Sequence, residues 1–204
     1  MTTTAVRAAR GQKEDRRRAL VLAAFGQIAE RGFEGLRTRE VAAEAGVNIA
    51  TLHYYFPTKE ALIRGVVAYA MERFRSTLAP HGSPGDQVAN HLRAVRALLR
   101  REPEVAAVMG ELALRSARDG SLAPILRETN DGWHRTLRRL LRRAVRDGEL
   151  ADELDSDDAA ALIMSTLSSM MLPPMSAARA DQALRELERW LSRPRPRSRS
   201  QSSN

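Results

Sequence analysis

The stretch that decides the fold is residues 38–62, which read TREVAAEAGVNIATLHYYFPTKEAL. Thr38 is a suitable helix N-cap, and Glu40 in the first turn complements the dipole of the helix that follows. Gly46 predicts a left-handed residue at the end of this helix, and the side-chain oxygen of Asn48 can cap the next one. The chain is therefore expected to turn sharply at Gly46 and to start a second helix at once.

The second helix of this stretch must end before Pro57, because proline lacks a backbone donor and disfavours a helical residue before it. Its buried side is expected to hold Leu52, Tyr55 and Phe56. The other positions offer donors, acceptors and aromatic rings without a carboxylate: Asn48, Ile49, Ala50, Thr51, His53 and Tyr54. Such a surface does not repel phosphate, and two helices joined by a tight glycine turn predict a DNA-binding helix-turn-helix.

A third helix is predicted to begin directly after Pro57. Thr58 caps it, and Lys59 places an ammonium group in the first turn, where the helix N-terminus also attracts anions. Apolar residues then continue at helical spacing to about Leu78. This helix therefore leaves the DNA-binding part of the chain and enters the next part.

Helical periodicity also covers the rest of the chain, and no strand pattern competes with it. Before the motif, a helix is predicted over residues 15–31, with an apolar stripe that packs on the two helices of the motif. After the motif, helices are predicted over residues 86–101, 103–118, 121–147, 156–172 and 181–191. The expected fold class is all-α.

Four segments are expected along the chain. Residues 1–12 are polar and basic and are expected to form a flexible arm, and residues 13–58 form an N-terminal three-helix, helix-turn-helix DNA-binding domain. Residues 59–192 form a larger C-terminal helical domain. Residues 193–204 form a basic tail of low complexity that is expected to be disordered.

Composition narrows the class of protein. The formal net charge of +8 favours an acidic partner such as nucleic acid. The chain has no cysteine, which excludes disulfides, thiolate zinc sites and cysteine nucleophiles. No stretch is long and apolar enough to cross a membrane, and the N-terminal segment lacks the apolar core of a signal peptide, so we expect a cytoplasmic protein without a membrane partner.

The sequence contains no constellation of catalytic residues. It lacks a glycine-rich phosphate loop with lysine, a His-Glu-x-x-His motif and a Gly-x-Ser-x-Gly motif. The four histidines do not cluster, and methionines at helical spacing are usually adaptable core residues. We therefore expect no enzyme activity, no metal site and no cofactor.

Residues 156–172, SDDAAALIMSTLSSMML, carry small residues and methionines on nearly every side. Such a helix needs two covering surfaces, of which one is its own domain and the other is a second subunit. The predicted dimer interface combines this helix with the last one and consists of Met164, Leu167, Met171, Leu184, Leu187, Trp190 and Leu191.

The motif resembles the N-terminal pattern of the tetracycline-repressor (TetR) family. The matching positions, in order and spacing, are Thr38, Val41-Ala42, Ala45-Gly46-Val47, Thr51-Leu52, Tyr55-Phe56, Lys59-Glu60 and Leu62. Beyond this N-terminal third, the resemblance rests on helix order. It implies a homodimeric transcriptional regulator whose C-terminal domain binds a ligand and dimerises through the last two helices. It also implies that the protein is a repressor, released from a pseudopalindromic double-stranded DNA operator by a small-molecule effector.

The resemblance further implies roles for single residues. Ile49, Ala50 and Tyr54 occupy positions that face base edges. The positions that touch or orient toward phosphate are Thr38, Asn48, Thr51, His53, Tyr55 and Lys59. Candidate residues of an effector pocket lie on the later helices and are Phe74, Met109, Leu112, Trp133, Leu137 and Met164.

Two departures from the family pattern affect the DNA contacts. His53 stands where the family usually has tyrosine, and Ile49-Ala50 replace a polar residue and a glycine. Imidazole donates more strongly to phosphate when protonated, so operator binding is expected to tighten modestly as the pH falls toward about 6. The alternatives are a nonspecific or architectural DNA-binding protein and an activator of the same fold, with a helical-bundle enzyme disfavoured.

Overall fold

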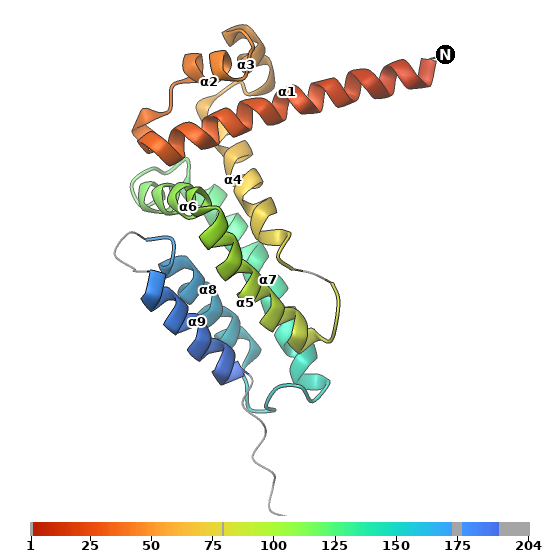
Figure 1. The fold of residues 1–204 in the computed structure, drawn as a ribbon, viewed down its shortest axis with the longest axis vertical. Coiled ribbons are helices and arrows are strands. Elements are labelled where there is room, and N and C mark those ends of the chain that lie inside the picture. Colours follow the sequence, from red (N-terminus) through yellow and green to blue (C-terminus); the bar gives the residue numbers. More distant parts are fainter. Residues whose placement is uncertain (1, 79, 173–176, 192–204) are drawn as a thin grey trace, which may run out of the picture. The chain divides into compact units, whose positions relative to one another are not determined.

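A computed structural model describes residues 2–78, 80–172 and 177–191, and these residues contain helices and no strand (Figure 1). The expected all-α class is therefore confirmed. In chain order the elements are α1 (Thr2–Arg31), the 3-10 turn η1 (Phe33–Gly35), α2 (Thr38–Glu44), α3 (Ile49–Tyr55), α4 (Lys59–Arg75), α5 (Pro84–Arg101), α6 (Pro103–Ser116), α7 (Ala123–Arg146), α8 (Ser156–Ser169) and α9 (Ala177–Leu191). The predicted tail of residues 193–204 lies outside the described residues.

Helix α1 begins much earlier than the sequence analysis placed it. The backbone is helical from Thr2, whereas a helix from residue 15 and a flexible arm over residues 1–12 were expected. The early residues AVRAAR consist mainly of alanine and arginine, which are strong helix formers, and Gly11 is the one weak helix former near them. Local helix propensity therefore prevails over the lack of an apolar stripe.

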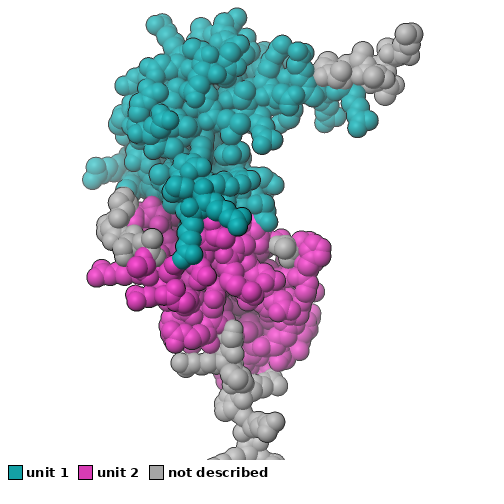
Figure 2. Space-filling model, in the orientation of Figure 1, with its two compact units in different colours: residues 1–76, 98–130 teal, residues 77–97, 131–204 magenta. Residues whose placement is uncertain are grey.

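The chain divides into two compact units, which Figure 2 draws in different colours. The first contains residues 1–76 and 98–130, and the second contains residues 77–97 and 131–204. All of α4 and α6 belong to the first unit, and the functional boundary between residues 58 and 59 stays a prediction. Helices α5 and α7 each contribute residues to both units.

The first unit is built on the apolar stripe of α1, whose members Leu20, Val21, Ala24, Phe25 and Ile28 are all buried as expected. Helix α4 packs closely against this stripe at Gly65. A Cβ atom there would lie 3.0 Å from Val21 Cγ2 and 3.1 Å from Phe56 Cε1. A larger residue at this position would therefore push α4 away from the helix-turn-helix.

Among the described residues of the second unit, the buried core is apolar apart from Thr77 and His91. His91 on α5 is fully buried; its Nε2 accepts a hydrogen bond from Trp133 Nε1 at 3.1 Å, and its Nδ1 lies 2.7 Å from Thr77 Oγ1. Because Nε2 is the acceptor, the neutral ring carries its proton on Nδ1 and donates it to Thr77. Burial lowers the pKa of His91 to about 4, so the ring is neutral at pH 7.

Candidate nucleic-acid interface

The turn between α2 and α3 is fixed by the backbone of Gly46. Gly46 has φ of 67°, Val47 N donates to Ala42 O at 2.9 Å, and Gly46 N donates to Ala43 O at 3.0 Å. These two hydrogen bonds form a Schellman motif, which satisfies carbonyl groups at the end of α2. The predicted left-handed glycine is confirmed.

The start of α2 differs from the prediction. Thr38 is the first helical residue, and Arg37 occupies the N-cap position without a side-chain cap. Instead, Arg37 N donates to Gln27 Oε1 at 3.1 Å, and Gln27 Nε2 donates to Glu44 Oε2 at 3.3 Å. Gln27 is buried on α1 and so holds α2 at both ends. The available signal in the sequence was one amide among the apolar residues of the α1 stripe.

The start of α3 is capped as predicted. Asn48 Oδ1 accepts hydrogen bonds from Thr51 N at 2.8 Å and from Thr51 Oγ1 at 2.9 Å. Leu52 and Phe56 are buried and anchor α3 to the unit. Tyr55 is half-buried, so the expectation that it shares their buried side is only partly met.

The outward face of α3 carries no carboxylate in the described structure. Ala50, His53 and Tyr54 are exposed, with 69% of Tyr54 accessible, while Ile49 and Thr51 are half-buried. This helix therefore presents an imidazole and a phenol to a partner.

The ring of Tyr54 is held from two sides. Its centroid lies 5.2 Å from that of Tyr55, edge to face, and Lys13 Nζ lies 3.4 Å from the Tyr54 hydroxyl and 5.4 Å from the ring centroid. Lys13 comes from α1, so the early helix supplies a cation next to the most exposed aromatic residue of α3. Lys13 is absent from the predicted site residues, although it is one of only two lysines in the chain.

The other lysine, Lys59, lies in the first turn of α4. Thr58 Oγ1 caps this helix by accepting from Ala61 N at 3.1 Å, as predicted. Lys59 Nζ lies 4.5 Å from the ring centroid of Phe33, and the guanidinium of Arg115 lies 4.6 Å from the same centroid. Phe33 N in turn donates to Glu111 Oε1 on α6 at 3.0 Å.

The residues predicted for an effector pocket are all buried, but they are divided between the two units. Phe74, Met109 and Leu112 belong to the first unit. The second unit holds the other three, which are Trp133, Leu137 and Met164.

The predicted dimer residues are mostly core residues of the second unit. Of the seven, Met171 is half-buried and Trp190 is exposed, while the others are buried: Met164, Leu167, Leu184, Leu187 and Leu191. Helices α8 and α9 lie side by side (Figure 1). The surface between them forms an open groove of about 330 Å³. Its lining consists of Leu162, Thr166, Ala183, Glu186, Leu187 and Trp190.

No helix in the described residues is long and apolar enough to cross a membrane. No group of three or more His, Cys, Asp or Glu side chains in residues 2–78, 80–172 and 177–191 is arranged to hold a metal ion.

A capped helix, a left-handed glycine turn and an outward helix without acidic groups define a helix-turn-helix DNA-binding protein. Sequence comparison identifies the family. Residues 20–66 match the profile of bacterial regulatory proteins of the tetR family, and residues 78–188 match the tetracyclin repressor-like C-terminal domain. The chain therefore belongs to the tetR family, a family of DNA-binding transcriptional regulators that are not enzymes.

Several known proteins are similar over part of the chain. The HTH-type transcriptional dual regulator CecR of Shigella flexneri is 33% identical over 106 residues, which cover 52% of this chain and 43% of CecR. The HTH-type transcriptional regulator RutR of Escherichia coli K12 is 35% identical over 72 residues, covering 32% of this chain and 34% of RutR. The chain thus spans about half or less of the length of these relatives.

Solved structures share the fold over most of the chain. A TetR-family regulator from Rhodococcus sp. has a TM-score of 0.76 at 24% identity, covering 88% of this chain and all of that one. AibR in complex with isovaleryl coenzyme A and operator DNA has a TM-score of 0.66 at 19% identity, with the same coverage.

Proposed function

We propose that this regulator is a homodimeric repressor that binds a pseudopalindromic operator and is released from it by a small-molecule effector. The observation that carries the proposal is the outward face of α3, on which Tyr54 is 69% exposed beside the ammonium group of Lys13. A face with donors, an aromatic ring and a cation, but no carboxylate, suits a major groove flanked by phosphates.

The proposed contacts divide into reading and positioning. Ile49, Ala50 and Tyr54 read base edges, and Ile49, which cannot read hydrogen bonds, suits the methyl group of thymine. The positioning residues are Thr38, Asn48, Thr51, His53, Tyr55 and Lys59. Asn48 and Thr51 are also bonded to each other, so they position α3 by fixing its start as well.

The proposed dimer uses the groove between α8 and α9. Leu162 and Trp190, exposed by 46% and 41%, lie at this groove, and two large apolar side chains on one surface favour a protein partner. A two-fold dimer would place two copies of α3 at about 34 to 36 Å, which is one turn of DNA. In this proposal residues 13–58 form the DNA-binding domain, and residues 59–192 form the ligand-binding and dimerisation domain.

A protein of the same fold supports the proposed binding of a small-molecule effector. AibR has been crystallised with both isovaleryl coenzyme A and operator DNA, so a structure of this fold can hold a small molecule and an operator together. An effector of the present chain must bind better to the conformation that has released DNA, because only differential affinity shifts an equilibrium. The candidate effector residues stay a proposal for each unit by itself, with Phe74, Met109 and Leu112 in the first unit and Trp133, Leu137 and Met164 in the second.

Selection of bound genomic DNA with the purified protein tests the proposal. We expect a pseudopalindromic consensus, a changed sequence preference for Tyr54→Ala, and for Lys59→Ala a uniform loss of affinity with a smaller salt dependence. Arg64→Ala, an exposed cation on α4 outside the proposed contacts, is the matched control for Lys59→Ala. Binding without any preferred site would instead favour a nonspecific DNA-binding protein.

A further inference from the structure

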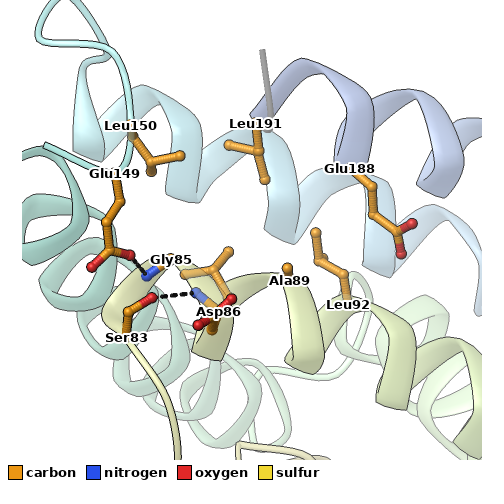
Figure 3. A pocket seen from close by; sticks show the side chains of 10 residues that line it. Ser83, Gly85, Asp86, Ala89, Leu92, Glu149, Leu150, Glu188 and Leu191 are labelled. Carbon is orange, nitrogen blue, oxygen red and sulfur yellow. Dashed lines mark hydrogen bonds between the residues drawn. The ribbon is translucent and has the colours of Figure 1, made fainter. Parts of the chain in front are cut away.

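The second unit contains a cavity that belongs neither to the predicted effector pocket nor to the groove between α8 and α9. It has a volume of about 330 Å³ and lies between the start of α5, the segment after α7 and the end of α9 (Figure 3). Its apolar wall consists of Val88, Ala89, Leu92, Leu150 and Leu191. A volume of this size falls at the lower end of the range of small-molecule sites.

The charged residues described in the lining of this cavity are all acidic. Asp86, Glu149 and Glu188 line it, and among its described lining residues none is basic. The start of α5, which would otherwise attract an anion, is already satisfied: Gly85 N donates to Glu149 Oε2 at 2.6 Å, and Asp86 N donates to Ser83 Oγ at 3.2 Å. An anionic ligand therefore finds a repulsive site.

Glu188, which is half-buried as a whole, differs from the other two carboxylates because one of its oxygen atoms is buried without a partner. Its Oε1 atom is shielded from solvent and has no hydrogen-bond partner in the described part of the chain. A buried acceptor without a donor is costly, and a carboxylate more so than a neutral group. The arrangement lacks one donor, which a positively charged group would supply most favourably.

We propose that this cavity binds an organic cation, with its ammonium group on Glu188 Oε1 and a short apolar body against Leu92, Leu150 and Leu191. The apolar wall supplies burial, the carboxylate supplies selection for positive charge, and the volume of about 330 Å³ limits the ligand to a small amine. The site is formed by the second unit alone and does not depend on the proposed operator binding.

Three probes with one apolar body and different head groups test the charge selection: hexylamine, hexanol and hexanoate. Titration of the full chain at pH 7, followed by ligand-observed NMR, is expected to give about tenfold tighter binding of hexylammonium than of hexanol, and no binding of hexanoate. Equal binding of all three probes would overturn the proposal.

Substitution of Glu188 assigns the effect to one atom. Glu188→Gln should remove the preference for hexylammonium and retain the binding of hexanol, which also shows that the cavity is intact. The matched control is Glu153→Gln, because Glu153 is an exposed carboxylate of the same unit outside the cavity. This variant should retain the wild-type preference of about tenfold for hexylammonium over hexanol. A preference that survives Glu188→Gln would contradict the assignment.

The chain's own arginines are the competing source of a cation, because the basic segment 193–199 follows Leu191, which lines the cavity. A variant that ends at Ser192 separates the two sources. Hexylammonium affinity within about twofold of wild type supports a free ligand. Binding that occurs only in the truncated variant would overturn the proposal and assign the cavity to that segment.

Discussion

The helix pairs α2–α3 and α8–α9 present opposite kinds of surface. Helices α2 and α3 have seven residues each, are tied together by the Gly46 turn and expose polar and aromatic groups. Helices α8 and α9 have 14 and 15 residues, bury Leu167 and Leu184, and expose large apolar groups at the groove. The first pair suits a hydrated, charged partner such as DNA, and the second suits an apolar partner such as another copy of the chain.

The two helix pairs are stabilised by different interactions. The short helices depend on caps, a glycine and a few buried anchors, because too few turns exist for helix propensity to hold them. The long pair depends on continuous apolar burial, which leaves its outer surface free to be apolar as well. Substitutions at the two helix pairs should therefore affect different properties, which are dimer affinity at α8–α9 and folding stability at α2–α3.

The largest effect is expected at the apolar groove. Trp190→Asp should weaken the proposed dimer by about a thousandfold, or about 4 kcal/mol, because a carboxylate replaces a central aromatic residue of the interface. Sedimentation equilibrium measures this change. Leu114→Asp is the control, since Leu114 on α6 is 56% exposed outside the groove and should leave the dimer intact. A dimer unaffected by Trp190→Asp would exclude this surface as the interface.

At the short pair, the largest effect should come from a buried anchor. Leu52 is only 1% exposed, so Leu52→Ala should lower the free energy of unfolding by about 3 kcal/mol through lost burial and a residual cavity. Urea unfolding gives the value. Leu114→Ala should change stability by less than about 0.5 kcal/mol, as expected for a surface residue. Similar losses for both variants would show that α3 is not anchored through Leu52.

Acid should affect the second unit more than the helix-turn-helix. The unfolded imidazole titrates near 6.5 and the pKa of folded His91 is about 4, so the unfolded chain binds more protons between these values. The contribution of His91 to the free energy of unfolding is complete above about pH 6.5 and falls as the pH drops toward 4. Between pH 7 and pH 5 the free energy of unfolding should fall by about 2 kcal/mol.

Hydrogen exchange as a function of pH locates this loss, which should appear in α5 and α7 before α2 and α3. His91→Phe should flatten the pH dependence of unfolding, whereas replacement of the exposed His81 by glutamine should leave it unchanged. A steep acid response that persists in His91→Phe would contradict this origin.

The smallest effect is expected at the turn of the short pair. Gly46→Ala forces a residue with a Cβ atom to keep φ of 67°, which should cost about 1 kcal/mol and weaken operator binding if α3 shifts. No neighbouring atom lies within 4 Å of a Cβ built there, so the cost is one of backbone conformation. Gly120→Ala, at an equally open site without positive φ, should be neutral, and an equal cost at both sites would argue against this cause.

Features with a local origin were predictable from the sequence. The Gly46 turn and the caps at Asn48 and Thr58 each involve residues within a few positions of one another, and all three are confirmed. The N-cap of α2 was predicted wrongly because the backbone N–H group of the actual N-cap, Arg37, is bound by Gln27. Gln27 lies ten residues earlier on another helix. Lys13 was missed for the same reason, since it meets Tyr54 across 41 residues of sequence.

The apolar face of α8 shows a second limit. Periodicity identified a helix with apolar groups on several sides, but it could not tell which side α9 covers. Leu167 and Leu184 became core residues, and Leu162, absent from the predicted interface, lies at the open groove. Which of two apolar faces remains exposed depends on tertiary packing, which a single sequence does not contain.

The two tryptophans of the chain occupy contrasting environments. Trp133 is buried and its indole N–H is bonded to His91, whereas Trp190 is 41% exposed at the groove between α8 and α9. Their fluorescence therefore separates into a blue-shifted emission shielded from iodide and a red-shifted emission open to it. One spectrum can thus follow the protonation of a core histidine and the covering of a surface groove at the same time, without any attached label.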